Sequence, residues 1–280
     1  MDSLVSTEWL ADNQDGADLI VLDASRHLPA ADRDAEAEFR SGHIPGARFL
    51  DLADLTDPHS SVGKTLPGPE QAARVFAAVG LDRSQRIVLY DDSDVKTSAR
   101  AWFILYGYGF SNLAILDGGL AKWKTEGRPL ETGSHPISST QVQQTGFTAR
   151  VRRKSDIFQN LSSKAEQVVD ARDAGRFSGE TTDTVHNLPG GHIPGAKNVF
   201  FRDLFADDGT FLRPAELRRL FERAGVDLSR PIVTSCGSGV TASVLLFALQ
   251  LAGIEDAALY DGSWSEWGAD PDLPVETGGG

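Results

Sequence analysis

Short apolar runs alternate with longer segments of helical period along the whole chain. The runs rich in Val, Ile and Leu predict buried strands at residues 19–22, 87–90, 113–116, 167–169, 232–234 and 257–260. Segments with apolar positions at helical spacing predict helices at residues 69–79, 99–107, 214–224 and 242–252. This alternation favours an α/β fold in which a mostly parallel sheet is flanked by helices.

Several sequence markers occur twice and in the same order, including a Gly-His-Ile-Pro-Gly-Ala motif that recurs letter for letter. The paired markers are residues 42–47 and 191–196, 21–23 and 168–170, and 117–119 and 261–263. Their offsets of 144 to 149 residues are far longer than the period of a solenoid. We therefore expect two copies of one domain, at residues 1–130 and 147–280, joined by a linker rich in Ser, Thr, Gly and Gln at residues 131–146.

The composition is typical of a globular protein. The chain has 280 residues, 40% hydrophobic and 24% charged, and its net charge of -13 opposes binding to nucleic acid or to anionic membranes. Its first residues do not read as a signal peptide, and no apolar stretch approaches the roughly 20 residues that cross a bilayer. We expect a soluble cytoplasmic protein. The single cysteine excludes an internal disulfide, and the histidines show no zinc-binding spacing, so no metal is predicted.

The only cysteine stands where a predicted strand meets a predicted helix. Cys236 follows the strand at 232–234, and Gly237 and Gly239 lie between it and the helix. The first amides of a helix lack intrahelical partners and favour an anion in front of them. The two glycines let the backbone curl so that successive N–H groups face one point. Cys236 is therefore a candidate thiolate nucleophile at the carboxyl end of the sheet.

The same residues also allow simpler interpretations. A lone cysteine is commonly a small buried apolar residue, but the adjacent glycines and Ser238 argue against this reading. We interpret His43 and His192 of the repeated motif as structural, because the motif is intact in the first copy, where Asp91 stands in place of Cys236. An imidazole there can pin a tight turn by hydrogen bonding. A carboxylate is no sulfur nucleophile, so the first domain is predicted to be catalytically silent.

Together these motifs resemble those of the two-domain rhodaneses, or sulfurtransferases, over nearly the whole chain. The resemblance is carried by the repeated His-Ile-Pro-Gly, by Leu-Asp-Gly-Gly-Leu-Ala-Lys-Trp at 116–123, by Tyr-Asp-Gly-Ser-Trp-Ser-Glu-Trp at 260–267, and by Cys-Gly-Ser-Gly-Val-Thr at 236–241. It implies two tandem rhodanese-like domains, with the active site in the C-terminal domain facing the interdomain cleft. The implied reaction places a sulfane sulfur on Cys236 as a persulfide. The sulfur then passes to cyanide or a thiol, including a protein thiol such as thioredoxin, and no cofactor is implied.

The residues after the cysteine separate branches of this family. Members that use thiosulfate have Arg and Lys there, whereas this chain has Gly-Ser-Gly and resembles members that use 3-mercaptopyruvate. The resemblance implies that Ser238 polarises or protonates the donor. It also implies that the loop amides of Gly237, Gly239, Val240 and Thr241 hold the persulfide, and that Arg176 binds the donor's carboxylate. A thiosulfate sulfurtransferase is the alternative within the family.

The chain departs from the family pattern at positions that bear on the donor. A second carboxylate-binding arginine is replaced by Val185, and a first-domain histidine and aspartate are replaced by Lys64 and Ala53. The family's Ser-His-Asp relay therefore cannot form in its usual way. Lys64 and His186 become candidates for the missing functions.

Two other classes of protein share parts of this pattern. A cysteine-dependent phosphatase would need an arginine six residues after the nucleophile, where this chain has Ala242. A non-enzymatic module that binds a partner or relays a persulfide stays open, although Cys236, Ser238 and both loop glycines favour chemistry.

Overall fold

The computed structural model describes residues 1–279, and its backbone divides into two compact units. The first unit contains residues 1–58, 66–149 and 207–211, and the second contains residues 59–65, 150–206 and the chain from 212 onward. Each unit thus holds a short segment from the other half of the sequence. The sequence-based domain boundaries, 1–130 and 147–280, stay a prediction.

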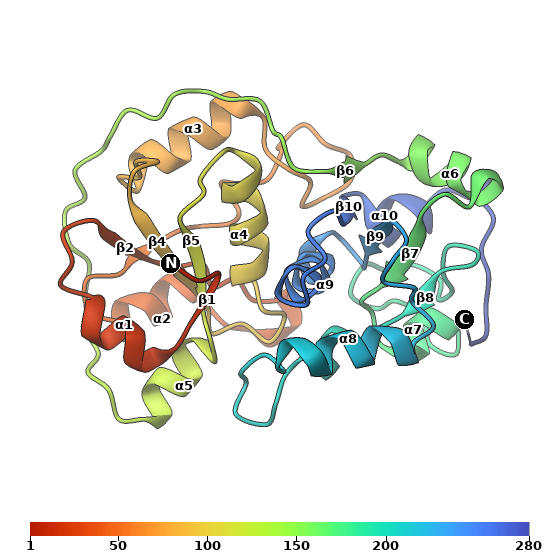
Figure 1. Ribbon diagram of the computed structural model, residues 1–280. Helices are drawn as coiled ribbons and strands as arrows, with labels where there is room; N and C mark the ends of the chain where they lie inside the picture. The colour runs from red at the N-terminus through yellow and green to blue at the C-terminus, as the bar shows by residue number, and fades with distance from the viewer. Residues whose placement is uncertain (280) are drawn as a thin grey trace. The chain divides into compact units, whose positions relative to one another are not determined.

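Parallel strands form the centre of the first unit (Figure 1). Within the described residues it has a five-stranded sheet of order β1-β5-β4-β2-β3, and every pairing is parallel. The strands are β1 (Leu4–Val5), β2 (Leu19–Asp23), β3 (Arg48–Phe49), β4 (Arg86–Tyr90) and β5 (Leu113–Leu116). The helices are α1 (Thr7–Asn13), α2 (Ala35–Ser41), α3 (Pro69–Ala78), α4 (Ser98–Gly107) and α5 (Gly119–Thr125), with a 3-10 turn at Pro29–Ala31.

The second unit repeats this topology. Within the described residues its five parallel strands have the order β6-β10-β9-β7-β8. They are β6 (Val151–Arg152), β7 (Gln167–Asp170), β8 (Lys197–Asn198), β9 (Ile232–Ser235) and β10 (Ala258–Tyr260). The helices are α6 (Lys154–Ser163), α7 (Ala174–Ser178), α8 (Pro214–Arg223), α9 (Val240–Leu251) and α10 (Ser263–Trp267), with a 3-10 turn at Phe201–Leu204. The predicted α/β fold and the internal duplication are confirmed.

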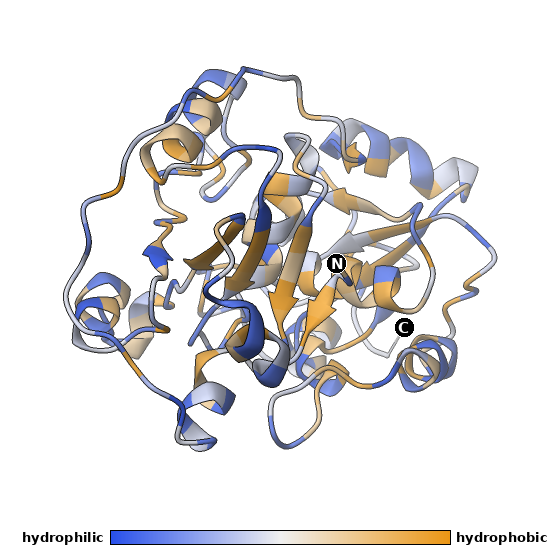
Figure 2. Cartoon of the chain, turned by 60° about the vertical axis from the view of Figure 1, so that its left-hand side comes forward, coloured by the Kyte–Doolittle hydropathy of each residue, from blue (hydrophilic) through white to orange (hydrophobic). Residues whose placement is uncertain are grey.

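Helices cover both faces of each sheet. In the first unit α1, α2 and α5 pack with β2, β4 and β5 in one apolar cluster, while α4 packs on β4 and β5. In the second unit α6, α7 and α10 cover one face, and α9 packs on β9 and β10 from the other. The central strands are hydrophobic and the outer helix surfaces are largely hydrophilic (Figure 2). Burial on both faces explains why these strands are continuous apolar runs in the sequence.

The helix after Cys236 begins earlier than its pattern predicts. We expected residues 242–252, whereas α9 starts at Val240, so Val240 and Thr241 form its first turn instead of a loop. Gly239 precedes the helix with φ of +79°, in the left-handed region that glycine adopts without strain. Residues Ala242 to Leu249 are all buried, as expected for a helix that is apolar on every side. Among the described residues, no helix has the length and apolar character needed to span a bilayer.

The segment predicted as a linker is bound to the first unit along its length. Glu131 exchanges two backbone hydrogen bonds of 2.9 Å with His43. The Thr140 hydroxyl donates to the Leu81 carbonyl at 2.6 Å. The Thr145 hydroxyl donates to the Tyr108 carbonyl at 3.0 Å. Apart from the bridge at Glu131, the segment has no helix or strand. Hydrogen bonds of this kind therefore hold it against the first unit.

The repeated His-Ile-Pro-Gly motif has the structural role expected from its sequence. The His43 ring stacks on Phe39 with centroids 3.9 Å apart, and Nδ1 lies 2.7 Å from the Phe39 carbonyl oxygen. His192 makes the same contacts with Phe177, at 3.8 and 2.8 Å. Both imidazoles are buried. They fix the turn after α2 and after α7 and lie outside the chemistry described next.

Candidate active site

The loop that carries Cys236 follows the central strand of the second sheet. Strand β9 ends at Ser235, Cys236 comes next, and α9 begins at Val240. Because the strands are parallel, this turn lies at the carboxyl end of the sheet, where ligands bind in α/β folds. The equivalent position in the first unit is Asp91, directly after β4. The Asp91 carboxylate accepts backbone hydrogen bonds of 2.8 to 2.9 Å from Ser98 and Ser93, so it is engaged in holding its own turn.

Helix α10 orients the peptide groups around Cys236. The Cys236 carbonyl accepts the Trp264 N–H at 2.9 Å. The Gly237 carbonyl accepts the N–H and the hydroxyl of Ser265 at 2.8 and 2.7 Å. With these carbonyls turned toward α10, the loop amides are left for other partners. Within residues 1–279, the N–H groups of Gly237, Ser238 and Gly239 donate no backbone hydrogen bond to the protein.

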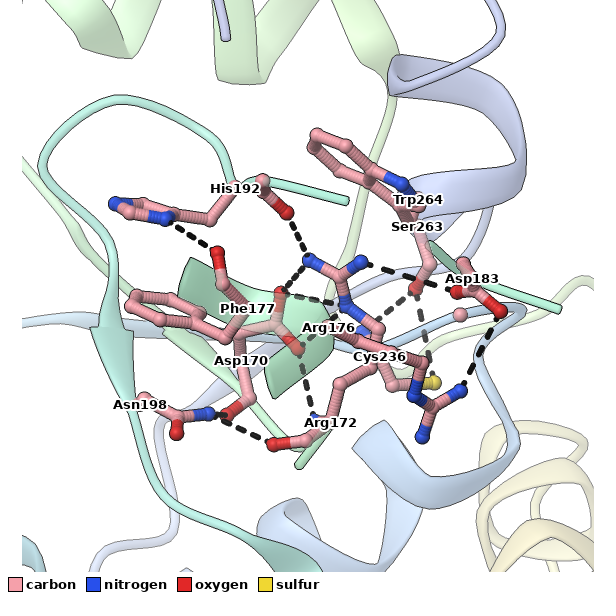
Figure 3. Close-up of polar contacts among 12 residues, drawn as sticks. Asp170, Arg172, Arg176, Phe177, Asp183, His192, Asn198, Cys236, Ser263 and Trp264 are labelled. Carbon is pink, nitrogen blue, oxygen red and sulfur yellow. Dashed lines mark hydrogen bonds and ion pairs between the residues drawn. The ribbon is translucent and has the colours of Figure 1, made fainter. Parts of the chain in front are cut away.

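Ser263 is a site residue that sequence reasoning missed. Its hydroxyl accepts the Cys236 N–H at 3.1 Å, donates to the Tyr260 carbonyl at 2.8 Å, and lies 4.0 Å from the Cys236 sulfur (Figure 3). Ser263 is fully buried and has φ of +50°, an uncommon conformation for a residue with a side chain. The equivalent residue of the first unit is Gly119. Comparing Asp-Gly-Ser with Asp-Gly-Gly between the repeats was the signal that could have found it.

The Cys236 side chain is more enclosed than a reactive thiol suggests. Its exposed fraction is 2%, as low as expected for a cysteine that is simply a small buried apolar residue. Its surroundings differ from a hydrocarbon core, because the Ser263 hydroxyl lies beside the sulfur and Ser238 is buried two residues away. The neighbouring loop residue Gly237 lies against an imidazole. The thiol therefore has a hydroxyl group beside it.

Glycine is needed at position 237 for a different reason from the predicted one. Its backbone is outside the left-handed region, unlike that of Gly239, so conformational freedom does not explain it. A Cβ atom at Gly237 would lie 2.1 Å from Cε1 of His186 and within 2.9 Å of both ring nitrogens. The glycine is required because the imidazole occupies that space. The structure thereby brings His186 against the residue that follows Cys236.

Asp183 links the charged side chains of the site. Its Oδ1 lies 3.0 Å from Nδ1 of His186. The same oxygen lies 3.5 Å from Nη1 of Arg176, and Oδ2 lies 3.8 Å from Nη1 of Arg172 (Figure 3). Burial acts to raise the pKa of Asp183. The His186 hydrogen bond and the charges of His186, Arg176 and Arg172 outweigh it and lower that pKa to about 2. Asp183 is thus a fully buried carboxylate that stays ionised near neutral pH.

Arg176 lies on α7 and is partly exposed. Asp173 caps this helix by accepting the Arg176 N–H at 3.0 Å, and its other carboxylate oxygen lies 2.5 Å from Nε. Burial acts to lower the pKa of Arg176, but Asp173 and Asp183 raise it overall. The guanidinium is therefore a permanent cation that its two neighbours orient. The structure brings Arg176 and His186 together on Asp183, as two of the predicted donor-binding residues.

Arg172 is a second residue that the sequence interpretation missed. Its guanidinium binds both oxygens of Asp170 at 2.7 to 3.1 Å and lies 4.4 Å above the Trp264 ring. In the first unit the matching positions are Asp23 and Ser25, so the ion pair belongs to the second unit alone among the two repeats. Comparing Val-Leu-Asp-Ala-Ser at 21–25 with Val-Val-Asp-Ala-Arg at 168–172 could have pointed to Arg172, because only the second copy has an arginine there. Arg172 connects the end of β7 to Asp183.

The remaining predicted residues are placed as follows. Lys64 has φ of +71° and belongs to the segment 59–65, which groups with the second unit. Val185, at the position of the missing arginine, is exposed and lies on the turn with His186. Val240 and Thr241 stand at the start of α9 and are partly buried. That the site faces the interdomain cleft stays a prediction.

Comparisons with known proteins find relatives that span nearly the whole chain. The family model of the rhodanese-like domain matches residues 6–126 and 155–270. Human 3-mercaptopyruvate sulfurtransferase is 38% identical over 95% of this chain and 91% of its own length, and the Escherichia coli K12 protein of the same name is 37% identical over 97% of each. Chicken thiosulfate sulfurtransferase is 36% identical over 95% of this chain and 93% of its own.

A solved structure shows the same fold. The crystal structure of SseA from Escherichia coli, described as a 3-mercaptopyruvate sulfotransferase with the rhodanese fold, superposes with a TM-score of 0.86. The two chains are 34% identical, and the match covers 94% of this chain and 99% of the other.

Proposed function

Because the chain belongs to the rhodanese family and is a sulfurtransferase, we propose that it moves a sulfane sulfur from 3-mercaptopyruvate to a thiophilic acceptor through a persulfide on Cys236. The observation that supports this most directly is the loop after Cys236, where, among the described residues, the N–H groups of Gly237, Ser238 and Gly239 have no backbone acceptor in front of the start of α9. A persulfide anion on Cys236 would receive those N–H groups and the positive end of the α9 dipole.

The donor preference follows from the charges near this loop. A thiosulfate dianion needs clustered cations, whereas the loop here has Gly237 and Ser238 directly after the cysteine. A 3-mercaptopyruvate monoanion needs one carboxylate site, and the fork of the Arg176 guanidinium suits a carboxylate. Ser238 supplies a hydroxyl beside the donor's carbonyl. Two relatives carry the mercaptopyruvate name over nearly the whole chain, which agrees with this preference.

The acceptor is a small nucleophile or a thiol. Cyanide and low-molecular-weight thiols attack the outer sulfur directly, and a protein thiol such as thioredoxin would do the same. The cytoplasm suits a thiol acceptor, because thiols are kept reduced there. Lys64 remains a candidate for a further cation near the donor.

Intact-mass measurement after incubation with each donor tests the proposal. We expect wild-type protein to gain one sulfur atom from 3-mercaptopyruvate, the Cys236→Ser variant to gain none, and cyanide to remove the added sulfur as thiocyanate. We expect the specificity constant to be higher for 3-mercaptopyruvate than for thiosulfate. A clear preference for thiosulfate would instead show a thiosulfate sulfurtransferase, the alternative within the family. No adduct with either donor would instead favour a binding module.

The role of Arg176 has its own test. Replacing Arg176 with Lys keeps a positive charge but removes the bidentate fork. We expect the donor KM to rise about tenfold with a smaller change in kcat, and an unchanged KM would exclude Arg176 from carboxylate binding.

A further inference from the structure

The placement of His186 suggests more than a structural role. The side chain is mostly buried, with 13% exposed, and its ring fills the space beside Gly237. Nδ1 is held 3.0 Å from the Asp183 carboxylate. Within the described residues, the buried Nε2 has no hydrogen-bond partner. One ring nitrogen is thus hydrogen-bonded and the other has no partner among the described residues, and the ring lies next to the residue that follows Cys236.

This vacancy differs from those of the other buried histidines. Nε2 of His43 and of His192 also lacks a hydrogen bond, but the carboxylates of Glu131 and Glu276 lie 3.8 Å from these atoms. Among residues 1–279, His186 forms its ion pair through Nδ1, with Asp183, and no carboxylate is paired with its Nε2. A buried polar atom without a protein partner is well suited to a ligand's hydrogen.

The chemistry of the donor requires one proton to move. When sulfur passes from 3-mercaptopyruvate, an S–S bond forms at the Cys236 thiolate and the donor's C–S bond breaks. The electron pair of the C–S bond goes to carbon and gives the enolate of pyruvate. The hydrogen on the donor sulfur must leave, and one hydrogen must be added to the enolate carbon. A single group that takes this proton and returns it balances the step without an oxidant or reductant.

We propose that His186 is this group, accepting the proton of the donor thiol at Nε2 and returning it to the enolate carbon. The proposal rests on the sulfur transfer proposed above. Asp183 is a positioning residue: it accepts the Nδ1 hydrogen, fixes the ring orientation and stabilises the imidazolium that forms in between. The pair replaces the relay whose first-domain histidine and aspartate are absent from this chain, and it uses a residue of the catalytic unit itself.

A comparison of two donors separates proton transfer from other roles. Thiosulfate gives up its outer sulfur to Cys236 and leaves as sulfite, so no proton has to reach carbon. We expect His186→Gln to lower the single-turnover rate of persulfide formation from 3-mercaptopyruvate by about 100-fold. The rate from thiosulfate should change by less than about twofold, and the donor concentration at half-maximal rate should stay the same. If the wild type takes no sulfur from thiosulfate, the test uses 3-mercaptopyruvate alone. A lower single-turnover rate at an unchanged half-saturating concentration then supports proton transfer.

His135→Gln is the matched control, because His135 is an exposed histidine that pairs with Glu131 at 2.6 Å. It should leave both rates unchanged. Equal losses with both donors in His186→Gln would show a structural role and overturn the proposal. A higher half-saturating concentration with an unchanged maximal rate, restored by His186→Lys, would show a carboxylate-binding cation and also overturn it. If wild-type protein gains sulfur from neither donor, the proposed function fails independently of His186.

Discussion

Asp23 and Asp170 occupy matching positions at the ends of β2 and β7, yet their surroundings predict opposite responses to the same substitution. Asp170 binds Arg172 through both oxygens. Asp23 has Ser25 in place of the arginine, and its carboxylate accepts the Ser25 N–H at 2.9 Å. Burial therefore dominates and raises the pKa of Asp23 from 3.8 to about 6, against smaller opposing effects of the Ser25 and Tyr90 hydrogen bonds.

The magnitude follows from linkage between proton binding and folding. A shift of about two pKa units corresponds to roughly 3 kcal/mol. Because the pKa is raised in the folded state, the folded protein binds the proton more tightly. This stabilisation is complete below about pH 4, the unfolded value, and is lost as the pH rises through about 6. At pH 8 the wild type holds a buried carboxylate, and its free energy of unfolding is lower by that amount.

Asp23→Asn should therefore stabilise the protein at pH 8 and have only about a third of that effect at pH 4.5. The amide oxygen keeps the Ser25 hydrogen bond, and no charge is buried. We expect a gain of about 1 to 3 kcal/mol at pH 8. Asp170→Asn removes the carboxylate that binds the buried Arg172 guanidinium at 2.7 to 3.1 Å, leaves only Asp183 as a carboxylate neighbour at 3.8 Å, and should lose about 3 kcal/mol.

Scanning calorimetry at both pH values is the assay, because it separates the transitions of two units that need not unfold together. Burial also raises the pKa of Asp117 to about 6, so the wild type changes over the same pH range for a second reason. The informative quantity is the difference between variant and wild type at each pH. A gain that is equal at pH 4.5 and pH 8, or a loss at pH 8, would refute the reasoning.

Three further substitutions test the loop and its counterpart. Gly237→Ala adds a Cβ atom 2.1 Å from His186 Cε1 and should displace the ring; persulfide formation from 3-mercaptopyruvate should fall about as far as in His186→Gln, and an unchanged rate would contradict the steric argument. Ser263→Gly suits the φ of +50° but removes the hydroxyl that accepts the Cys236 N–H, so persulfide formation should slow about tenfold while thermal stability changes little. Gly119→Ala, at φ of +58°, adds a Cβ atom 2.5 Å from a backbone oxygen and should cost about 2 kcal/mol in a denaturant titration; a cost below about 0.5 kcal/mol would show that the turn relaxes.

The two repeats have diverged at one end of a shared fold. Where the second unit has Cys236, Arg172 and Ser263, the first has Asp91, Ser25 and Gly119. The Asp91 carboxylate binds the backbone of its own turn, which fills the role of holding the loop without leaving amides for a ligand. That the first unit is catalytically silent stays a prediction, and these three replacements are the residues on which it depends.

Much of the fold could be read from local patterns. The predicted strands and the helices at 69–79, 99–107 and 214–224 agree with the structure to within a residue or two, because burial on both faces gives parallel strands an unbroken apolar signature. The start of α9 was misplaced by two residues, since Gly239 forms the cap and nothing in the apolar period marks it. The reason for Gly237 was also misjudged, because space beside it is taken by a residue 51 positions earlier.

The sequence by itself determined the duplication, the α/β class, the family and the position of Cys236 on a strand-to-helix turn. These properties depend on periodicity and on motifs that lie within a few residues of one another. Only the tertiary structure decided that His186 packs on Gly237, that Asp183 joins His186, Arg176 and Arg172, and that Ser263 lies beside the sulfur. These residues come from the segments that follow β7, β9 and β10, and they meet because the parallel sheet brings the carboxyl ends of its strands to one edge. Contacts across that edge depend on side-chain size and direction, which no local pattern along the chain records.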